Sequence, residues 1–420
     1  MFTILANGFR VPDIRKKLMF VLSAFLIFSL GAHIPVPGIN TDALSNLIGQ
    51  GTLFGMMDMF VGGSLRRFSI FALGVTPYIN ASIIFQLLTI VVPKLEELQK
   101  EGETGRKVIM QWTRYLTIAL AFFQAIGMMI MLKQSGGILP QQATIFYAVL
   151  VILSLVGGTS FLMWVGEEIT AKGVGNGISL IIFAGIINSL PQQIYQTYGQ
   201  AKMNGNYAGL VFLLFISIFT IAFIIFIHLG QRKIPVQYAK RIIGRKVISG
   251  QTTYLPMKVN TAGVIPIIFA ISVLMLPATI TQIIPDPHIQ QIFAKFSNSG
   301  SVIYNVIYFL LVFIFTYFYT AVVFNPKDVA DRMKKHGGFI LGIRPGRPTA
   351  EYLERIMVRI TFMGAVFLGL IAVLPAIVVM MTGLSAFGLG GTSILILIGV
   401  ALDTINQVEA QLLMRHYEGF

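Results

Sequence analysis

Apolar segments long enough to span a membrane recur along the whole chain. A helix that crosses the roughly 30 Å hydrocarbon core of a bilayer needs about 20 predominantly apolar residues. Ten such segments follow one another, at about 17–35, 73–92, 113–133, 144–165, 176–192, 207–229, 260–283, 302–324, 354–377 and 391–411. Hydrophobic residues make up 55% of the 420 and charged residues only 11%, which is more apolar than a soluble chain of this size can hide. The sequence predicts an all-helical integral membrane protein with ten transmembrane helices.

Lys and Arg are distributed unequally between the two sides of the predicted membrane. The connections on the side of both termini carry 25 of the 31 basic residues, those on the other side carry five, and Arg359 lies inside the ninth segment. The connection 230–259 alone has seven basic residues and no acidic one. Because Lys- and Arg-rich loops stay in the cytosol, we expect both termini and the loops 230–259 and 325–355 there. No convincing cleavage site follows the first segment, so we expect it to be retained as a helix.

An even number of spans with both termini on one side implies two halves of five spans that start on opposite sides of the membrane. Many transport proteins use such inverted halves, with the pathway at their interface. We expect an N-terminal half over 1–192, an external hinge connection over 193–206 and a C-terminal half over 207–420. This expectation rests on parity and loop placement, since no sequence repeat is evident between the halves.

The predicted spans contain few ionisable residues. Coupled ion or proton transport normally places charged side chains inside the helix bundle, yet away from the ends of the spans only Arg359 and Asp403 are charged. A snorkelling arginine and a packed aspartate are their ordinary interpretation. HExxH, GxSxG and Walker motifs are absent, as is cysteine, so we expect no catalytic residue, no metal site, no cofactor and no disulfide. Any transport would then be driven by a partner, which we expect at the basic cytosolic loops.

Short motifs lie in order from the first span to the last. They are GAHIPVPGI at 31–39, FSIFALGVTPYI at 68–79, KEGETGR at 100–106, GNGIS at 175–179, KVNTAGVIP at 258–266, GIRPG at 342–346 and GGTS at 390–393. Together they resemble the SecY/Sec61-alpha family of protein-conducting channel subunits. The chain departs from the family at Ser29, where members often carry Arg, and its short outer loops leave an accessory paralogue open as an alternative.

The resemblance implies a gated, passive channel in the bacterial plasma membrane that has an hourglass pore. Such a channel translocates unfolded secretory proteins bearing signal sequences and releases hydrophobic segments laterally into membrane lipid. The implied partners are the SecE and SecG subunits, the SecA ATPase and the ribosome. The implied pore ring comprises Ile79, Ile83, Ile178, Ile182, Ile268 and Ile396. A narrow collar of stiff side chains without hydrogen-bonding groups excludes water and ions, although helix or lipid packing is the ordinary interpretation of any single isoleucine.

The segment 53–67 is apolar but too short to span a membrane, and Gly62-Gly63 ends its apolar part. The resemblance implies that it is a plug helix, which seals the outer funnel and moves aside when a chain inserts. A Met-rich composition suits a packed but releasable element, whereas a segment lying on the membrane surface is the alternative. The implied plug residues are Phe54, Met56, Met57, Met59, Phe60 and Val61.

The resemblance also implies a lateral gate between the second and third spans on one side and the seventh and eighth on the other. We expect its polar side chains to form interhelical hydrogen bonds of about 1 kcal/mol each, with ordinary packing as the alternative. The gate residues are Asn80, Ser82, Gln86, Gln124, Asn260 and Thr261. The residues expected to dock SecA or the phosphates of ribosomal RNA are Arg232, Lys233, Lys240, Arg241, Arg245, Lys246 and Arg344.

Two other classes of function would leave different marks. A small-solute secondary transporter with inverted repeats would need a coupling charge inside the membrane and a closed solute cavity. A scaffold that transports nothing would need neither an isoleucine constriction nor basic docking loops.

Overall fold

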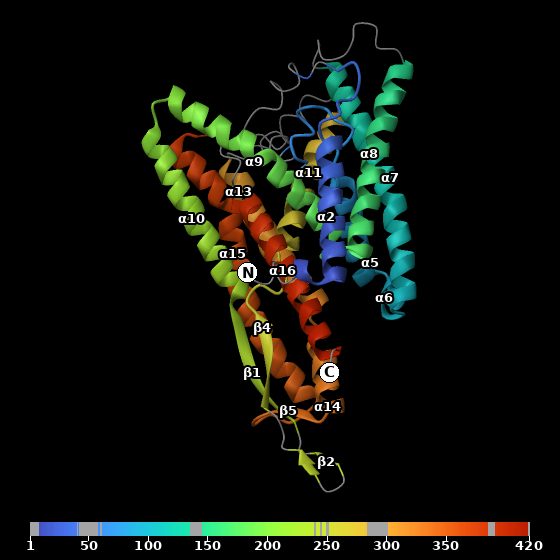
Figure 1. Cartoon of the computed structure of the whole chain (residues 1–420), viewed down its shortest axis with the longest axis vertical. Helices are drawn as coiled ribbons and strands as arrows, with labels where there is room; N and C mark the ends of the chain where they lie inside the picture. The colour runs from blue at the N-terminus through green and yellow to red at the C-terminus, as the bar shows by residue number, and fades with distance from the viewer. Residues whose placement is uncertain are drawn as a thin grey trace.

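A computed structural model of the chain describes residues 8–39, 41, 58, 61–134, 145–238, 241–243, 246–248, 252–283, 301–384 and 391–418. The protein is mostly helical, and a helix overlaps each of the ten predicted apolar segments (Figure 1). These helices are α2 (Pro12–Gly31), α5 (Thr76–Val91), α7 (Glu103–Gln134), α8 (Ile145–Lys172), α9 (Gly177–Met203), α10 (Tyr207–Leu229), α11 (Ile265–Ile283), α13 (Val302–Val323), α15 (Arg347–Thr382) and α16 (Gly391–Glu418).

Seven helices in the described ranges are each long and apolar enough to cross a membrane, or up to eight if α5 and α6 (Pro93–Lys100) form one span. The α5–α6 pair is bent by 100°. The bend falls at Val92, whose extended backbone is the conformation favoured before a proline. The helix α2 is not among these seven, because charged residues occupy its first two turns. The chain is therefore a multi-pass membrane protein.

Helices that are close in sequence pack together. In the first part of the chain α5 and α8 both contact α7, and α2 contacts α8 and α9; in the second part α13 contacts α11 and α15, and α10 contacts α15 and α16. The contacts of α11 with α5 and α7, and of α9 with α10 and α16, join the two groups.

The expected hinge connection over 193–206 is helical for most of its length. The helix α9 continues past Pro191 to Met203, and the chain breaks only at Asn204–Asn206, where Gly205 has a φ of +65°. The side chain of Asn206 caps the next helix by accepting a hydrogen bond from the Gly209 N–H at 2.8 Å. Its amide also donates to the Thr382 carbonyl at the end of α15, again at 2.8 Å. The break between the two groups of helices is therefore a short, capped turn.

A small β-sheet lies at one end of the molecule and adds to the predicted all-helical fold. The strand β1 (Gln231–Tyr238) pairs antiparallel with both β4 (Thr252–Lys258) and β5 (Gly338–Ile340). A separate short hairpin comprises β2 (Arg241–Ile243) and β3 (Lys246–Ile248). The sheet packs on α14 (Pro326–Lys335) and on the start of α15. The shared hydrophobic core contains Ile234, Val236 and Ile340 of the sheet and Met333 of α14. Both predicted cytosolic loops therefore belong to one folded unit.

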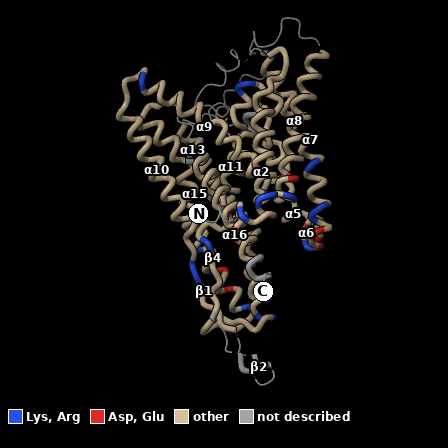
Figure 2. Tube along the Cα trace, in the orientation of Figure 1, with Lys and Arg blue, Asp and Glu red and all other residues tan. Residues whose placement is uncertain are grey.

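Basic residues gather at the end of the molecule that carries this sheet. Figure 2 shows Lys and Arg on β1, α14, α6 and the neighbouring helix ends, whereas the opposite end carries few. The asymmetry counted along the sequence is thus also an asymmetry in space.

Candidate functional site

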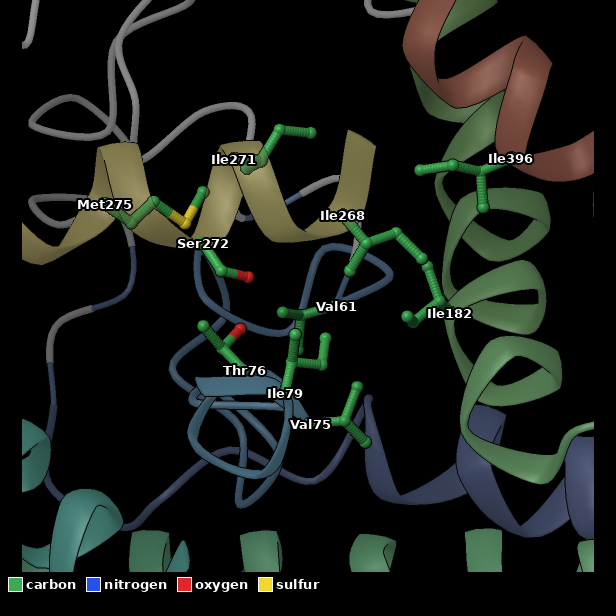
Figure 3. Close-up of a pocket in the computed structure, with 10 residues that line it drawn as sticks. All are labelled: Val61, Val75, Thr76, Ile79, Ile182, Ile268, Ile271, Ser272, Met275 and Ile396. Carbon is green, nitrogen blue, oxygen red and sulfur yellow. The ribbon is translucent and has the colours of Figure 1, made fainter. Parts of the chain in front are cut away.

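One cavity lies where the two groups of helices meet (Figure 3). Its walls come from the segment before α5 and from α5, α9, α11 and α16. The lining residues are Val61, Val75, Thr76, Ile79, Ile182, Ile268, Ile271, Ser272, Met275 and Ile396. Ile182 and Ile268 point toward one another from α9 and α11. Helices far apart in the sequence therefore converge on one apolar space.

The cavity is small and almost entirely apolar. Its volume is about 30 Å³, and one water molecule needs about 10–15 Å³ of such space. Thr76 and Ser272 are the two polar residues among the ten that line it, and none of the ten is charged. A narrow space with so few hydrogen-bonding groups disfavours water and ions. At this volume the cavity is too small to hold a polypeptide.

The structure brings four of the six predicted ring residues to this cavity, namely Ile79, Ile182, Ile268 and Ile396. Ile83 and Ile178 are not among its lining residues. Ile83 is buried in the main core, and Ile178 packs on that core, where its side chain would meet a Cβ placed on Gly166 of α8. In each i,i+4 pair, Ile79 with Ile83 and Ile178 with Ile182, only one member therefore lines the cavity.

Several lining residues were missed by the sequence reasoning. Ile271, Ser272 and Met275 lie three, four and seven residues after Ile268, so they share its face of α11. Thr76 and Val75 lie three and four residues before Ile79 in the same way. The helical period, applied outward from each predicted isoleucine, would have found all five.

Val61 enters the cavity from the segment before α5, and two glycines allow it to do so. A Cβ on Gly74, which has a φ of +57°, would lie 2.9 Å from Val61. A Cβ on Gly62, whose φ is +73°, would lie 3.2 Å from the Cα of Gly185 on α9. Side chains are disfavoured at positive φ, and neither position has room for one. Val61 thus packs closely against the turn before α5, and Gly62 against α9.

Hydrogen bonds anchor the same segment to two helices. The Asn188 amide of α9 donates to the Gly62 carbonyl at 3.0 Å, and the Ser29 hydroxyl of α2 donates to the Asn188 side-chain oxygen at 3.3 Å. The small Ser29 side chain thus supports Asn188. The buried carboxylate of Asp58 accepts the Arg66 backbone N–H at 2.9 Å and lies 3.6 Å from its guanidinium. Burial raises the pKa of this carboxyl, and both Arg66 contacts oppose that shift.

Most of the predicted plug lies outside the described residues, namely Phe54, Met56, Met57, Met59 and Phe60. Val61 is described, and it lines the cavity. A plug role for this segment therefore stays a prediction.

The predicted gate residues make local hydrogen bonds. Gln86 donates to Ser82 on the same helix, at 3.1 Å, and Thr261 to the Lys258 carbonyl three residues earlier, at 3.0 Å. The Asn260 amide donates to the Gly263 carbonyl, also at 3.0 Å. Asn80 and Gln124 are buried. We expected bonds between helices here, whereas the described bonds stay within one helix or turn; a gating role stays a prediction.

The predicted docking residues lie on the sheet unit. Arg232 and Lys233 are exposed on β1, and Arg344 is exposed in the turn after β5. The Thr349 hydroxyl donates to the Arg344 carbonyl at 2.8 Å, which ties this turn to α15. Lys240 and Arg245 lie outside the described residues, and Arg241 and Lys246 are described only as parts of β2 and β3. Described residues from both loops thus lie exposed on the unit that the sheet forms with α14 and the start of α15.

Comparison with known proteins identifies close relatives. A family model described as SecY matches residues 69–405. The chain is 44% identical to the protein translocase subunit SecY of Streptomyces galbus over 439 aligned residues, which cover 100% of both chains. It is 46% identical to the subunit of the same name from Halalkalibacterium halodurans over 431 residues, again covering 100% of both.

Solved structures share the fold at low sequence identity. One described as "The structure of a protein conducting channel" has a TM-score of 0.65 and 19% identity, covering 94% of this chain and 92% of the other. Another, "Sec61 in the Canine ribosome-channel complex from the endoplasmic reticulum", has a TM-score of 0.61 and 18% identity with the same coverage. At this identity they bear on the fold alone.

Proposed function

The chain belongs to the SecY family and is the channel subunit of a protein translocase, and we propose that its polypeptide pathway runs through the apolar cavity between α5, α9, α11 and α16. The convergence of Ile79, Ile182, Ile268 and Ile396 on that cavity is the observation that carries this proposal. In the closed state these side chains meet and exclude ions; in the open state they separate around a translocating chain. The two groups of helices, roughly 1–203 and 207–420, act as the two halves that move apart.

The segment around Val61 supports a role in sealing the closed state. Val61 fills part of the cavity from one side, and Gly62, Asn188 and Ser29 hold it there. We propose that this segment withdraws when a chain inserts. Deleting residues 54–61 is then expected to raise ion leak while leaving much of the transport; a deletion variant as tight as the parent would contradict the sealing role.

The distribution of charge supports an orientation in the bacterial plasma membrane. Lys and Arg concentrate at the sheet end of the molecule (Figure 2), and such residues favour the cytosolic side. We therefore propose that the sheet unit and both termini are cytoplasmic. Hydrophobic segments of client proteins would leave sideways between α5 and α7 on one side and α11 and α13 on the other.

The channel is proposed to be a passive conduit rather than an enzyme. None of the ten residues that line the cavity is charged, so it offers no group for coupling to an ion gradient. This composition and the family membership also leave the small-solute transporter unsupported. The driving force is expected from SecA or the ribosome docked on the basic sheet unit, with SecE and SecG completing the complex. A Sec61 in a ribosome-channel complex shares this fold.

Reconstitution tests the proposed function directly. Purified chain, SecE and SecA in proteoliposomes are expected to protect a preprotein from external protease when ATP is supplied. Omitting the chain is expected to abolish this protection. Protection that appears without the chain, or that does not depend on ATP, would contradict a SecA-driven channel.

A further inference from the structure

Two exposed arginines on α15 have no carboxylate partner among the described residues. Arg355 and Arg359 lie one helical turn apart on the same side of the helix, and like charges at this spacing repel. Some other exposed basic residues do have partners: Lys100 lies 2.6 Å from Glu96, and on the same helix Arg347 lies 3.2 Å from Glu351. The carboxylate four residues before Arg355 is therefore already paired with Arg347.

The pair lies where the apolar surface of α15 begins. Val358, between the two arginines, is 46% exposed, and Phe362 and Met363, just beyond them, are 52% and 69% exposed. Since a helix rises about 1.5 Å per residue, the arginines are about 6 Å apart along the axis. Their side of the helix therefore presents two cations followed by a continuous apolar face. This arrangement fits the boundary between lipid headgroups and hydrocarbon.

A row of aromatic rings continues from the arginines along the contact between α13 and α15. The Phe313 ring centroid lies 5.2 Å from that of Tyr317 and 5.9 Å from that of Phe362, which belongs to α15. Phe309 follows one turn further, at 6.5 Å from Phe313. Gly369 makes room for it, because a Cβ there would lie 2.6 Å from the Phe309 ring.

Tyr317 joins this aromatic row to the arginine turn. Its hydroxyl donates a hydrogen bond of 3.3 Å to the carbonyl of Val358, which lies between Arg355 and Arg359. The bond fixes the tyrosine ring beside the turn that carries the arginines. The cationic end and the apolar row therefore form one surface with a fixed spacing.

We propose that this surface binds an anionic phospholipid. The guanidinium groups of Arg355 and Arg359 hold its phosphate, and an acyl chain lies along Phe313, Phe309 and Phe362. Arginine is suited to this role because its planar fork donates two parallel hydrogen bonds to phosphate oxygens. A zwitterionic lipid is held less tightly, because its own cation repels the arginine pair. A free phosphate ion makes no use of the aromatic row.

The test measures lipid retention on the purified, folded chain. Native mass spectrometry from micelles that contain equal amounts of phosphatidylglycerol and phosphatidylcholine is expected to show a preference for phosphatidylglycerol. The double variant Arg355→Gln, Arg359→Gln is expected to lower that preference about 10-fold. The matched control Arg347→Gln removes one exposed arginine from the same helix, and it is expected to keep the preference.

Further measurements separate this site from a general charge effect and from misfolding. Arg355→Lys with Arg359→Lys keeps the charge but loses the fork, so an intermediate preference is expected. Phe313→Ala is expected to weaken binding of both lipids, and millimolar inorganic phosphate is expected not to displace them. The proposal is overturned if the wild-type chain shows no preference, if Arg347→Gln lowers it as much as the double variant, or if inorganic phosphate releases the lipid. A thermal melt of each variant confirms that it is folded.

Discussion

Replacing Gly62 with alanine is expected to unseat Val61 and make the closed channel leak. Gly62 has a φ of +73°, and an L-residue in the left-handed region costs about 1–2 kcal/mol. The added Cβ would also lie 3.2 Å from the Gly185 Cα and 3.3 Å from the Asn188 amide nitrogen. Both contacts belong to α9 and to the closed state, so withdrawal of the segment from the cavity would relieve them.

The expected size of the effect follows from this cost. If the substitution destabilises the closed state by about 1–2 kcal/mol relative to the open state, the fraction of open channels rises about 5- to 30-fold. Ion flux through reconstituted proteoliposomes, with no preprotein present, measures that fraction. The matched control is Gly102→Ala, because Gly102 has a φ of +81° but a Cβ there would meet nothing within 4 Å. Equal leak from the two variants would refute the view that contact with α9 seats the segment.

Three further substitutions test the packing and the docking surface. In a thermal melt, Gly158→Ala is expected to destabilise the fold by about 1–3 kcal/mol or more, because the new Cβ would overlap the Ile70 carbonyl before α5. The control Gly157→Ala is expected to be neutral or stabilising, because a Cβ there would meet nothing within 4 Å. Asp58→Asn is expected to lower stability by about 1–3 kcal/mol, because the Arg66 guanidinium loses its anionic partner, and an unchanged melt would contradict the pairing. Arg344→Glu is expected to slow SecA-driven translocation about 10-fold or more while the chain still inserts into the membrane; a normal rate would count against docking there.

The positions of the helices were predictable from the sequence because hydrocarbon demands a long apolar run and an internally bonded backbone. The point at which α9 ends was not predictable in this way. The predicted connection began at residue 193, yet Ser189, Gln193 and Thr197 are buried on one face of the continuing helix. Polar side chains that bond along their own helix let it extend beyond its apolar part.

The sheet of β4, β1 and β5 left a weak signal in the sequence. In β1 the buried Ile234 and Val236 alternate with exposed residues, as a half-buried strand requires. Pro235 and Pro256 stand inside the two longest strands, and proline argues against a strand. The partner strand β5 lies about 100 residues further along. Pairing over that distance could not be deduced from local pattern.

The predicted ring was only partly brought together for a comparable reason. A spacing of four residues places two side chains on one face of a helix, but it does not say how the helix is rotated in the bundle. Ile182 lines the cavity, whereas the side chain of Ile178, one turn earlier, packs against Gly166 of α8. The missing information is the tertiary contact, here a glycine on a neighbouring helix that accepts one isoleucine and not the other.

Crosslinking to a stalled preprotein tests most directly whether the cavity is the polypeptide pathway. The chain contains no cysteine, so Ile268→Cys introduces a single thiol into the lining. A preprotein with one cysteine, arrested during SecA-driven translocation, is expected to form a disulfide with it. Ile187 is 44% exposed and does not line the cavity, so Ile187→Cys is expected to form no disulfide with the preprotein. Adducts at the outer position, or none at the cavity position while transport proceeds, would show that the chain crosses elsewhere.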